Sequence, residues 1–158
     1  MRLFYKYFFL GLLFMSCSDI YFSEHKPLNS IDKKNFSPSI VGSYITPSRD
    51  TILIKDNSII FPFGNLIYEN DFKMFTLNNQ QFISFKFKNG WQYVGYEKRN
   101  DTLEIRINKS NQSVKELNNI SKINGNTYLI GDISLKEFTK IKSHEFFDEK
   151  YLLKKINK

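Results

Sequence analysis

The feature that most constrains this 158-residue chain is the alternation of apolar and polar side chains. In the segment 102–107, the apolar residues Leu103, Ile105 and Ile107 alternate with polar ones. Successive side chains of a β-strand point to opposite faces, so a period of two predicts a strand with one buried face. Glu104 lies between these apolar residues, and we expect it to face water.

Short turn signals separate several segments of this kind. They are Asp56-Asn57, Asn78-Asn79-Gln80, Lys88-Asn89-Gly90, Asn100-Asp101 and Asn124-Gly125. Asn, Asp and Gly tolerate the left-handed backbone that tight hairpin turns require. About eight short strands joined in this way predict an all-β fold built as an antiparallel meander. A meander protects its edges by curling into a small barrel or by folding into a sandwich, and both remain open here.

Helical signals are confined to the C-terminal part of the chain. Ser134 is placed to cap a segment in which Leu135, Phe138 and Ile141 recur at helical spacing. The segment 148–156 also has apolar residues four apart and lysines near its end, where cations favour the helix dipole. We therefore expect a short C-terminal helix beside the strands.

The first strand of the meander carries a family resemblance. Ile40-Val41-Gly42-Ser43-Tyr44 resembles the Gly-x-Trp segment that begins lipocalin-like domains, with Tyr44 in the place of the Trp. The motif covers these few residues, and the rest of the resemblance is one of architecture. It implies a barrel with a cavity for an apolar ligand, and it identifies no ligand-binding residue.

Cys17 is the single cysteine of the chain, and the residues in front of it have the pattern of an export signal. Arg2 and Lys6 are basic, the run 3–14 is largely apolar, and Ser16 stands directly before the cysteine. The arrangement resembles the signal peptide and lipobox of bacterial lipoproteins of the Bacteroidota type, with Phe-Met in place of the usual Leu and small residue. The run is shorter than the roughly 20 residues that span a bilayer, as in a cleaved signal.

The resemblance to lipoproteins implies how the chain is divided. Residues 1–16 are the signal peptide, residues 17–38 are a flexible tether anchored by lipid on Cys17, and residues 39–158 are a single β-rich domain. Within the tether, the apolar residues 20–22 are expected to form at most one short packed segment. Acyl chains such as palmitate would hold the protein to the membrane.

The expected location follows from the same resemblance. The residue after the cysteine is Ser18 rather than Asp, which implies an outer-membrane lipoprotein facing the periplasm. Removing the signal peptide lowers the formal charge from +7 to +5, because it takes away Arg2 and Lys6 and no acid. The remaining basic residues are scattered, and export argues against nucleic acid as a partner.

Catalytic and metal-binding signals are weak, so we expect no cofactor, no metal site and no catalytic residue. His25 falls in the expected tether, and His144 is followed by Glu145 and Asp148 in a polar stretch. A zinc site normally needs three or four ligands, and no such spacing is present. The chain also lacks the Gly-x-Ser-x-Gly and glycine-rich phosphate motifs.

The aromatic strand around residue 91 is the best candidate for a contact surface. Trp91 and Tyr93 share one face, whereas Tyr96 lies on the other. Together with Phe85 on the preceding strand, they are candidates for contact with a ligand or partner, and packing in the core is the competing interpretation.

The sequence thus favours a non-enzymatic cell-envelope lipoprotein whose β-domain binds a small apolar ligand or a protein partner. An accessory or structural subunit of an outer-membrane complex is one alternative. An envelope hydrolase using His144 and a nearby acid is the least favoured.

Overall fold

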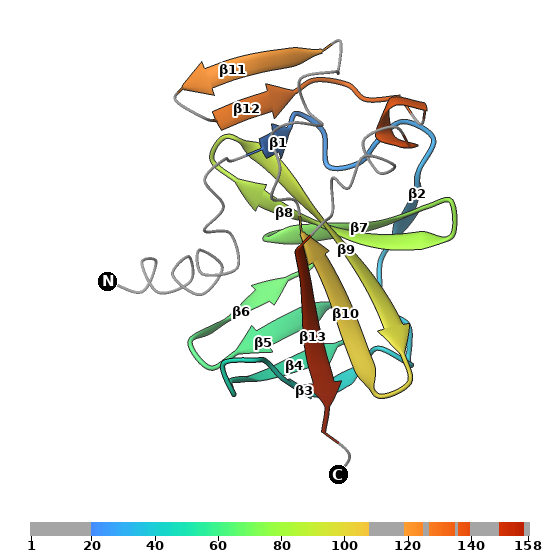
Figure 1. The fold of residues 1–158 in the computed structure, drawn as a ribbon, viewed down its shortest axis with the longest axis vertical. Coiled ribbons are helices and arrows are strands. Elements are labelled where there is room, and N and C mark those ends of the chain that lie inside the picture. Colours follow the sequence, from blue (N-terminus) through green and yellow to red (C-terminus); the bar gives the residue numbers. More distant parts are fainter. Residues whose placement is uncertain (1–19, 108–118, 125–126, 135, 140–148, 157–158) are drawn as a thin grey trace.

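The computed structural model describes residues 20–107, 119–124, 127–134, 136–139 and 149–156. These residues form strands and one short helix, which confirms the predicted all-β class (Figure 1). The strands are β1 (Ile20–Phe22), β2 (Ile31–Lys33), β3 (Gly42–Ile45), β4 (Thr51–Lys55), β5 (Ser58–Phe61), β6 (Gly64–Ile67), β7 (Phe72–Leu77), β8 (Gln80–Phe87), β9 (Gly90–Arg99), β10 (Thr102–Ile107), β11 (Ile120–Asn124), β12 (Thr127–Ile130) and β13 (Glu149–Lys155).

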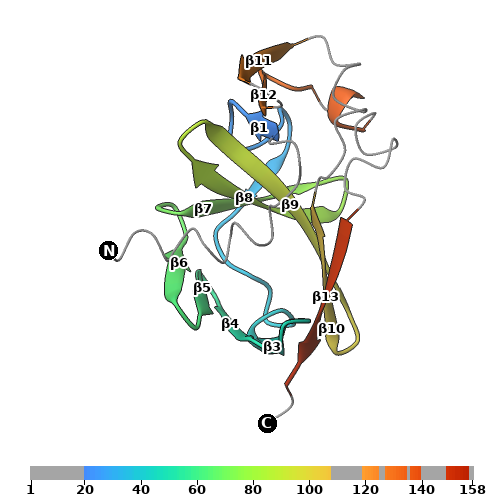
Figure 2. The same cartoon turned by 60° about the vertical axis from the view of Figure 1, so that its left-hand side comes forward.

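The described strands join into one sheet that curls into a half-barrel. The hydrogen-bonded path runs β11-β12-β1-β9-β10-β13-β3-β4-β5-β6, and β8, β7 and β2 extend from β9. Sequential hairpins such as β4–β5 and β7–β8 are antiparallel, as the meander predicts, whereas β1 runs parallel to β12. Figure 2 shows β10, β13, β3, β4, β5 and β6 following one another around the curve.

The predicted hairpin turns occur where Asn and Asp residues stand. Asn78 and Asn79 have φ angles of 49° and 62° between β7 and β8, and Asn100 has 52° between β9 and β10. These left-handed values are tolerated by Asn at modest cost. Asp56-Asn57 likewise joins β4 to β5, whose end residues Lys55 and Ser58 pair.

Strand β9 is ten residues long and lies in the middle of the sheet. One of its edges pairs with β8, and the other pairs with β10 along one part and with β1 along another. Gly90 permits the approach of β1, because a Cβ there would lie 2.6 Å from the carbonyl oxygen of Phe22. Its φ of 139° is also a conformation that other residues rarely adopt.

The two faces of β7–β9 carry separate apolar cores. The concave cluster fills part of the half-barrel with Phe36, Ile40, Tyr44, Ile52, Ile54, Ile59, Leu66, Phe72, Met74, Ile83, Phe85, Val94, Tyr96, Leu103, Ile107 and Leu153. The covered cluster lies on the opposite face and consists of Ile20, Phe22, Phe75, Leu77, Phe82, Tyr93, Ile130, Ile133 and Phe138. Alternation along β9 sends Val94 and Tyr96 to the first cluster and Tyr93 to the second.

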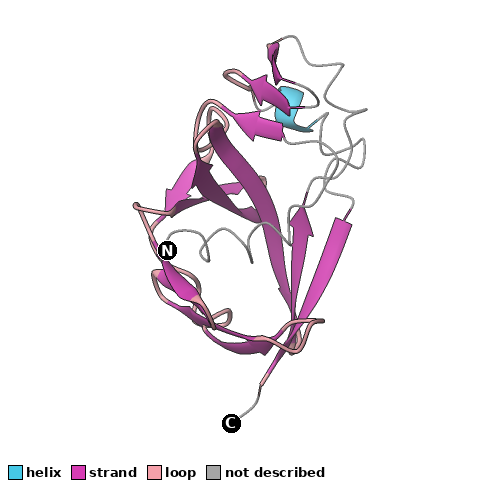
Figure 3. Ribbon diagram, turned by 90° about the vertical axis from the view of Figure 1, so that its left-hand side faces the viewer, coloured by secondary structure: helices cyan, strands magenta, loops and turns pink. Residues whose placement is uncertain are grey.

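The short helix occupies residues 136–139, coloured cyan in Figure 3. Ser134 caps it as predicted, because its Oγ accepts a hydrogen bond from the Glu137 amide at 3.3 Å. The Glu137 carboxylate in turn accepts from the Ser134 amide at 3.0 Å, which completes a capping box. Phe138 then places its ring in the covered cluster.

The second helix candidate, 148–156, is wrong, because Glu149–Lys155 is strand β13. Leu153 is buried in the concave cluster while Leu152 is 57% exposed, which is the alternation of a strand. Pairing with β10 along its length and with β3 at its end overrides the helical spacing of its apolar residues.

One further expectation is confirmed and one needs correction. The short packed segment expected at residues 20–22 is the buried strand β1, and Phe36 in the expected tether is buried as well. Glu104 does not face water, because only 6% of its surface is exposed. The guanidinium group of Arg106 donates to its carboxylate at 2.5 Å, and Arg99 lies 3.8 Å away, so the two arginines cover it.

Candidate functional site

A cavity of about 390 Å³ opens on the concave side of the half-barrel. Its walls come from the inward faces of β4, β5, β8, β9, β10 and β13, where the alternation places apolar side chains. The wall residues on these strands are Ile52, Ile54, Ile59, Phe61, Ile83, Phe85, Val94, Tyr96, Leu103, Ile105, Ile107, Tyr151 and Leu153. The site is therefore a hollow left within the concave cluster.

The loop 46–50 supplies a polar section of the cavity lining. The Ser48 hydroxyl donates to the Asp50 carboxylate at 2.7 Å, and the Asp50 amide donates to Thr46 Oγ1 at 3.0 Å. Of the described lining residues, only Asp50 carries a formal charge. Its carboxylate is thus held by its own turn, as expected for an acid in a loop.

Tyr96 places a polar group in the apolar wall. The residue is 5% exposed, and its ring meets that of Phe36 edge-on at 5.8 Å. Its hydroxyl is buried and has no hydrogen-bond partner among the described residues. Burial also raises the pKa of Tyr96, so the phenol keeps its proton and remains a donor.

The four aromatic candidates divide between the two faces. Phe85 and Tyr96 line the cavity, but Trp91 and Tyr93 do not. Tyr93 belongs to the covered cluster, where it stacks on Phe22 with ring centroids 3.8 Å apart. The structure therefore brings two candidates together at the cavity and gives Tyr93 a packing role.

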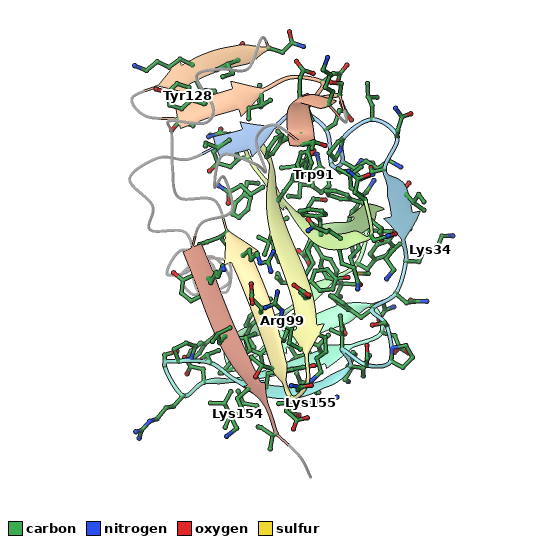
Figure 4. All side chains as sticks on the ribbon, turned by 45° about the vertical axis from the view of Figure 1, so that its right-hand side comes forward. Lys34, Trp91, Arg99, Tyr128, Lys154 and Lys155 are labelled. Atoms are coloured by element: carbon green, nitrogen blue, oxygen red, sulfur yellow. The ribbon has the colours of Figure 1, made fainter. Side chains whose placement is uncertain are left out.

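Trp91 and Tyr93 share a face, as predicted from their spacing, and Trp91 packs against the covered cluster. The ammonium groups of Lys73 and Lys86 lie 5.8 and 5.9 Å from its ring centroid. Figure 4 shows Trp91 in the upper part of the molecule, far from Lys155 at the lower end of the half-barrel.

The hydroxyl of Tyr93 donates to the Glu24 carbonyl oxygen at 2.7 Å. Burial, and to a smaller extent the charge of Glu24, raises the pKa of Tyr93. Among the described residues, the Tyr93 hydroxyl therefore has a hydrogen-bond partner and the Tyr96 hydroxyl does not.

Neither histidine is a described residue of the cavity lining: His25 lies elsewhere, and His144 falls outside the described ranges. His25 Nε2 is 3.2 Å from Asp32 Oδ1, and Lys26 Nζ is 2.6 Å from Asp32 Oδ2. Burial acts to raise the pKa of Asp32, but hydrogen bonds and the charges of Lys26 and His25 outweigh it and lower the pKa. His144, Glu145 and Asp148 fall outside the described ranges, as do Cys17 and the signal peptide.

Within the described ranges, His, Cys, Asp and Glu residues form no group that could hold a metal ion. The one helix of this part of the chain is also too short to cross a bilayer.

Sequence reasoning missed several residues of the cavity. Loop residues Thr46 and Ser48 carried no distinguishing signal, and Phe61 could not be separated from ordinary strand residues. Tyr151 and Leu153 were assigned to a helix, although their spacing of two was the signal that could have placed them on a wall. Comparison of the chain with protein-family models, curated proteins and solved structures found no match.

Proposed function

We propose that this protein is a non-enzymatic lipoprotein of the cell envelope whose β-domain takes a small apolar ligand into the half-barrel. The observation that carries the proposal is the cavity of about 390 Å³ with walls made mainly of apolar side chains. Its volume falls within the roughly 300–1,000 Å³ of typical ligand sites. No residue is assigned a catalytic role in this proposal.

The physical basis is the transfer of apolar surface out of water. Each Å² of apolar ligand surface buried against these walls contributes about 25 cal/mol. A cavity lined by Ile, Leu and Phe offers few partners to water, so an apolar occupant competes with water on favourable terms. The curled sheet also holds the walls in place before binding, which reduces the ordering cost.

The membrane-anchoring part of the proposal is supported by the segment before Cys17. Diacylation of the cysteine would hold the protein stably, because two acyl chains together suffice for lasting attachment. We propose an outer-membrane anchor with the domain facing the periplasm. Metabolic labelling with a fatty acid tests it: the label is expected on the unmodified protein and not on Cys17→Ala, and equal labelling of both would exclude this anchor.

Ligand binding is tested by filling the cavity. The full chain in lipid nanodiscs is exposed to a photoreactive alkane, and the labelled peptides are mapped by mass spectrometry. We expect label on the peptide that contains Leu103, and little label there in Ile83→Trp, whose indole would occupy the hollow.

Leu152→Trp is the matched control, because Leu152 is 57% exposed and absent from the cavity lining. The control is expected to label like the unmodified protein. Equal labelling of Leu103 peptides in Ile83→Trp and in the control would contradict binding in the cavity.

The alternative is a protein-binding role, either for the domain itself or as a subunit of an outer-membrane complex. It is favoured by β6, which ends the strand path and pairs only with β5 among the described strands. Phe63 and Ile67 beside this edge are 63% and 41% exposed. Crosslinking in native membranes would recover one consistent partner in this case, and recovery of the monomer alone would count against it.

A further inference from the structure

Polar groups without partners gather on one face of β9. In the described part of the chain, three buried side-chain atoms lack a hydrogen-bond partner: Gln92 Oε1, Tyr96 Oη and Lys98 Nζ. All three residues have even numbers, so their side chains leave the strand on the same side as Val94 in the cavity wall. A buried polar group without a partner costs free energy, and three on one strand face call for an explanation.

Lys98 is the most informative of the three. Its ammonium group lies 5.9 Å from the centroid of the Tyr44 ring, within the range of a cation–π contact. Lys155 lies over the same ring at 6.0 Å, but its ammonium also donates to the carbonyl oxygen of Val41 at 3.0 Å. The ammonium group of Lys98 is therefore shielded from water, and no oxygen among the described residues accepts a hydrogen bond from it.

Lys98 is not itself a lining residue of the cavity, but its place on β9 brings it beside two residues that are. It pairs in the ladder with Leu103, which lines the cavity, and it follows Tyr96 by two residues on the same face. Side chains two apart on a strand leave the backbone about 6–7 Å from each other. The flexible four-carbon stem of lysine allows the ammonium to turn from the Tyr44 ring toward the Tyr96 hydroxyl.

We propose that the cavity takes a single-chain amphiphile, a long-chain fatty acid, whose carboxylate is bound by the Tyr96 hydroxyl and the Lys98 ammonium and whose hydrocarbon tail lies among the apolar walls. This inference rests on the proposed function and names the ligand class for the same site. One carboxylate satisfies both unpartnered donors, since each of its oxygens accepts hydrogen bonds and its charge neutralises that of Lys98.

Asp50 fixes the direction of the ligand. It lines the cavity, and its charge repels a second carboxylate from the loop 46–50. The Tyr96–Lys98 end is the part of the face that presents two donors. A volume of about 390 Å³ at the low end of ligand sites also suits one acyl chain better than a lipid with several.

The test compares a fatty acid with its uncharged ester. The full chain in nanodiscs is exposed to a diazirine-bearing palmitic acid or to its methyl ester, at equal amounts in the membrane. After illumination, mass spectrometry measures label on the cavity peptide that contains Leu103. We expect the acid to label this peptide about 10-fold more than the ester, the ratio typical of a hydrogen-bonded charge.

The variants assign the preference to the two donors. Lys98→Met is expected to lower labelling by the acid to that of the ester, and Lys98→Arg to retain most of the preference. Tyr96→Phe should lower the preference severalfold, because it removes one of the two hydrogen bonds. Lys86→Met is the control, since Lys86 is exposed on the opposite face, and it should leave the ratio unchanged.

The outcomes separate the inference from the function on which it rests. Equal labelling of the cavity by acid and ester in the unmodified protein overturns the carboxylate site and leaves apolar binding standing. Labelling of the cavity by neither probe overturns both. A 10-fold preference that survives in Lys98→Met also overturns the assignment, and circular dichroism verifies that each variant is folded.

Discussion

The two faces of β7–β9 both bury apolar side chains, but they differ in what lies against them. On the covered face, aromatic rings from distant parts of the chain lie over the sheet: Phe22 stacks on Tyr93 with centroids 3.8 Å apart, and Phe138 meets Phe82 edge-on at 5.4 Å. On the concave face, the sheet bends around its own side chains and leaves a cavity of about 390 Å³. Side chains of other elements pack against the covered face, whereas the curvature of the sheet leaves a cavity for a ligand on the concave face.

The largest expected effect comes from removing one ring from each face of β8. Phe82 is 2% exposed and meets both Phe75 and Phe138, so Phe82→Ala should cost about 3–5 kcal/mol of unfolding free energy. Phe85 borders the cavity, and Phe85→Ala should cost at least about 1 kcal/mol less, because its ring already lacks neighbours on one side. Urea denaturation measures both, and equal losses would mean that the cavity wall is packed as tightly as the covered cluster.

Replacing an isoleucine by the larger phenylalanine on each face also distinguishes the covered cluster from the cavity wall. Ile133→Phe in the covered cluster should cost about 1–3 kcal/mol, since Ile133 is buried among packed side chains that a larger side chain would have to displace. Ile59→Phe should cost less than about 1 kcal/mol, because the ring can extend into the cavity. The same denaturation experiment compares the pair, and a larger loss for Ile59→Phe would refute the existence of usable space.

The two tyrosines of β9 offer a finer comparison. Tyr93→Phe removes a hydrogen bond to Glu24 and should cost about 1 kcal/mol. Tyr96→Phe removes a buried hydroxyl without a partner among the described residues, so stability should stay unchanged or rise by up to about 1 kcal/mol. Unfolding is measured without added ligand, and a loss in Tyr96→Phe equal to that in Tyr93→Phe would contradict an unsatisfied hydroxyl.

The smallest effect concerns the segment between β1 and β2. The lowered pKa of Asp32 means that its carboxylate stabilises the fold above the unfolded-state value of 3.8, and that this contribution is lost as pH falls through the lower folded-state pKa. Since Asp32 is half exposed, Asp32→Asn should cost less than about 0.5 kcal/mol at pH 7 and nothing near pH 2. Denaturation at both pH values measures the difference, and a cost that persists at pH 2 would exclude this ion pair as its source.

Local signals predicted most of the hairpins. Asn and Asp turns between alternating segments carry their information within a few residues, so the hairpins joining β4 to β5 and β7 to β8 could be found from sequence alone. Strand β13 could not, because its apolar residues satisfy a helical spacing as well as a period of two. Only its partners β10 and β3 decide between them.

For the candidate site, the sequence predicts which side chains share a face but not which face is hollow. Alternation placed Trp91 and Tyr93 on one face of their strand and Tyr96 on the other, and the structure agrees. The pattern does not reveal which face is hollow, because that depends on the bending of the sheet and on what covers it. The three residues of β1 are likewise too few for a periodic signal, and their burial depends on β12, about a hundred residues later.

The strand order has a consequence for how this fold is made. β1 pairs in parallel with β12, and β3 pairs with β13. These early strands therefore complete their hydrogen bonding only when strands about a hundred residues later are present. Pairing over such sequence distances is slow, because the chain entropy is lost before the contacts form. Before these last strands are available, the hairpins of β4–β5 and β7–β10 can form, but neither β1 nor β3 has its last neighbour. Strand β13 must therefore be present before the sheet can close.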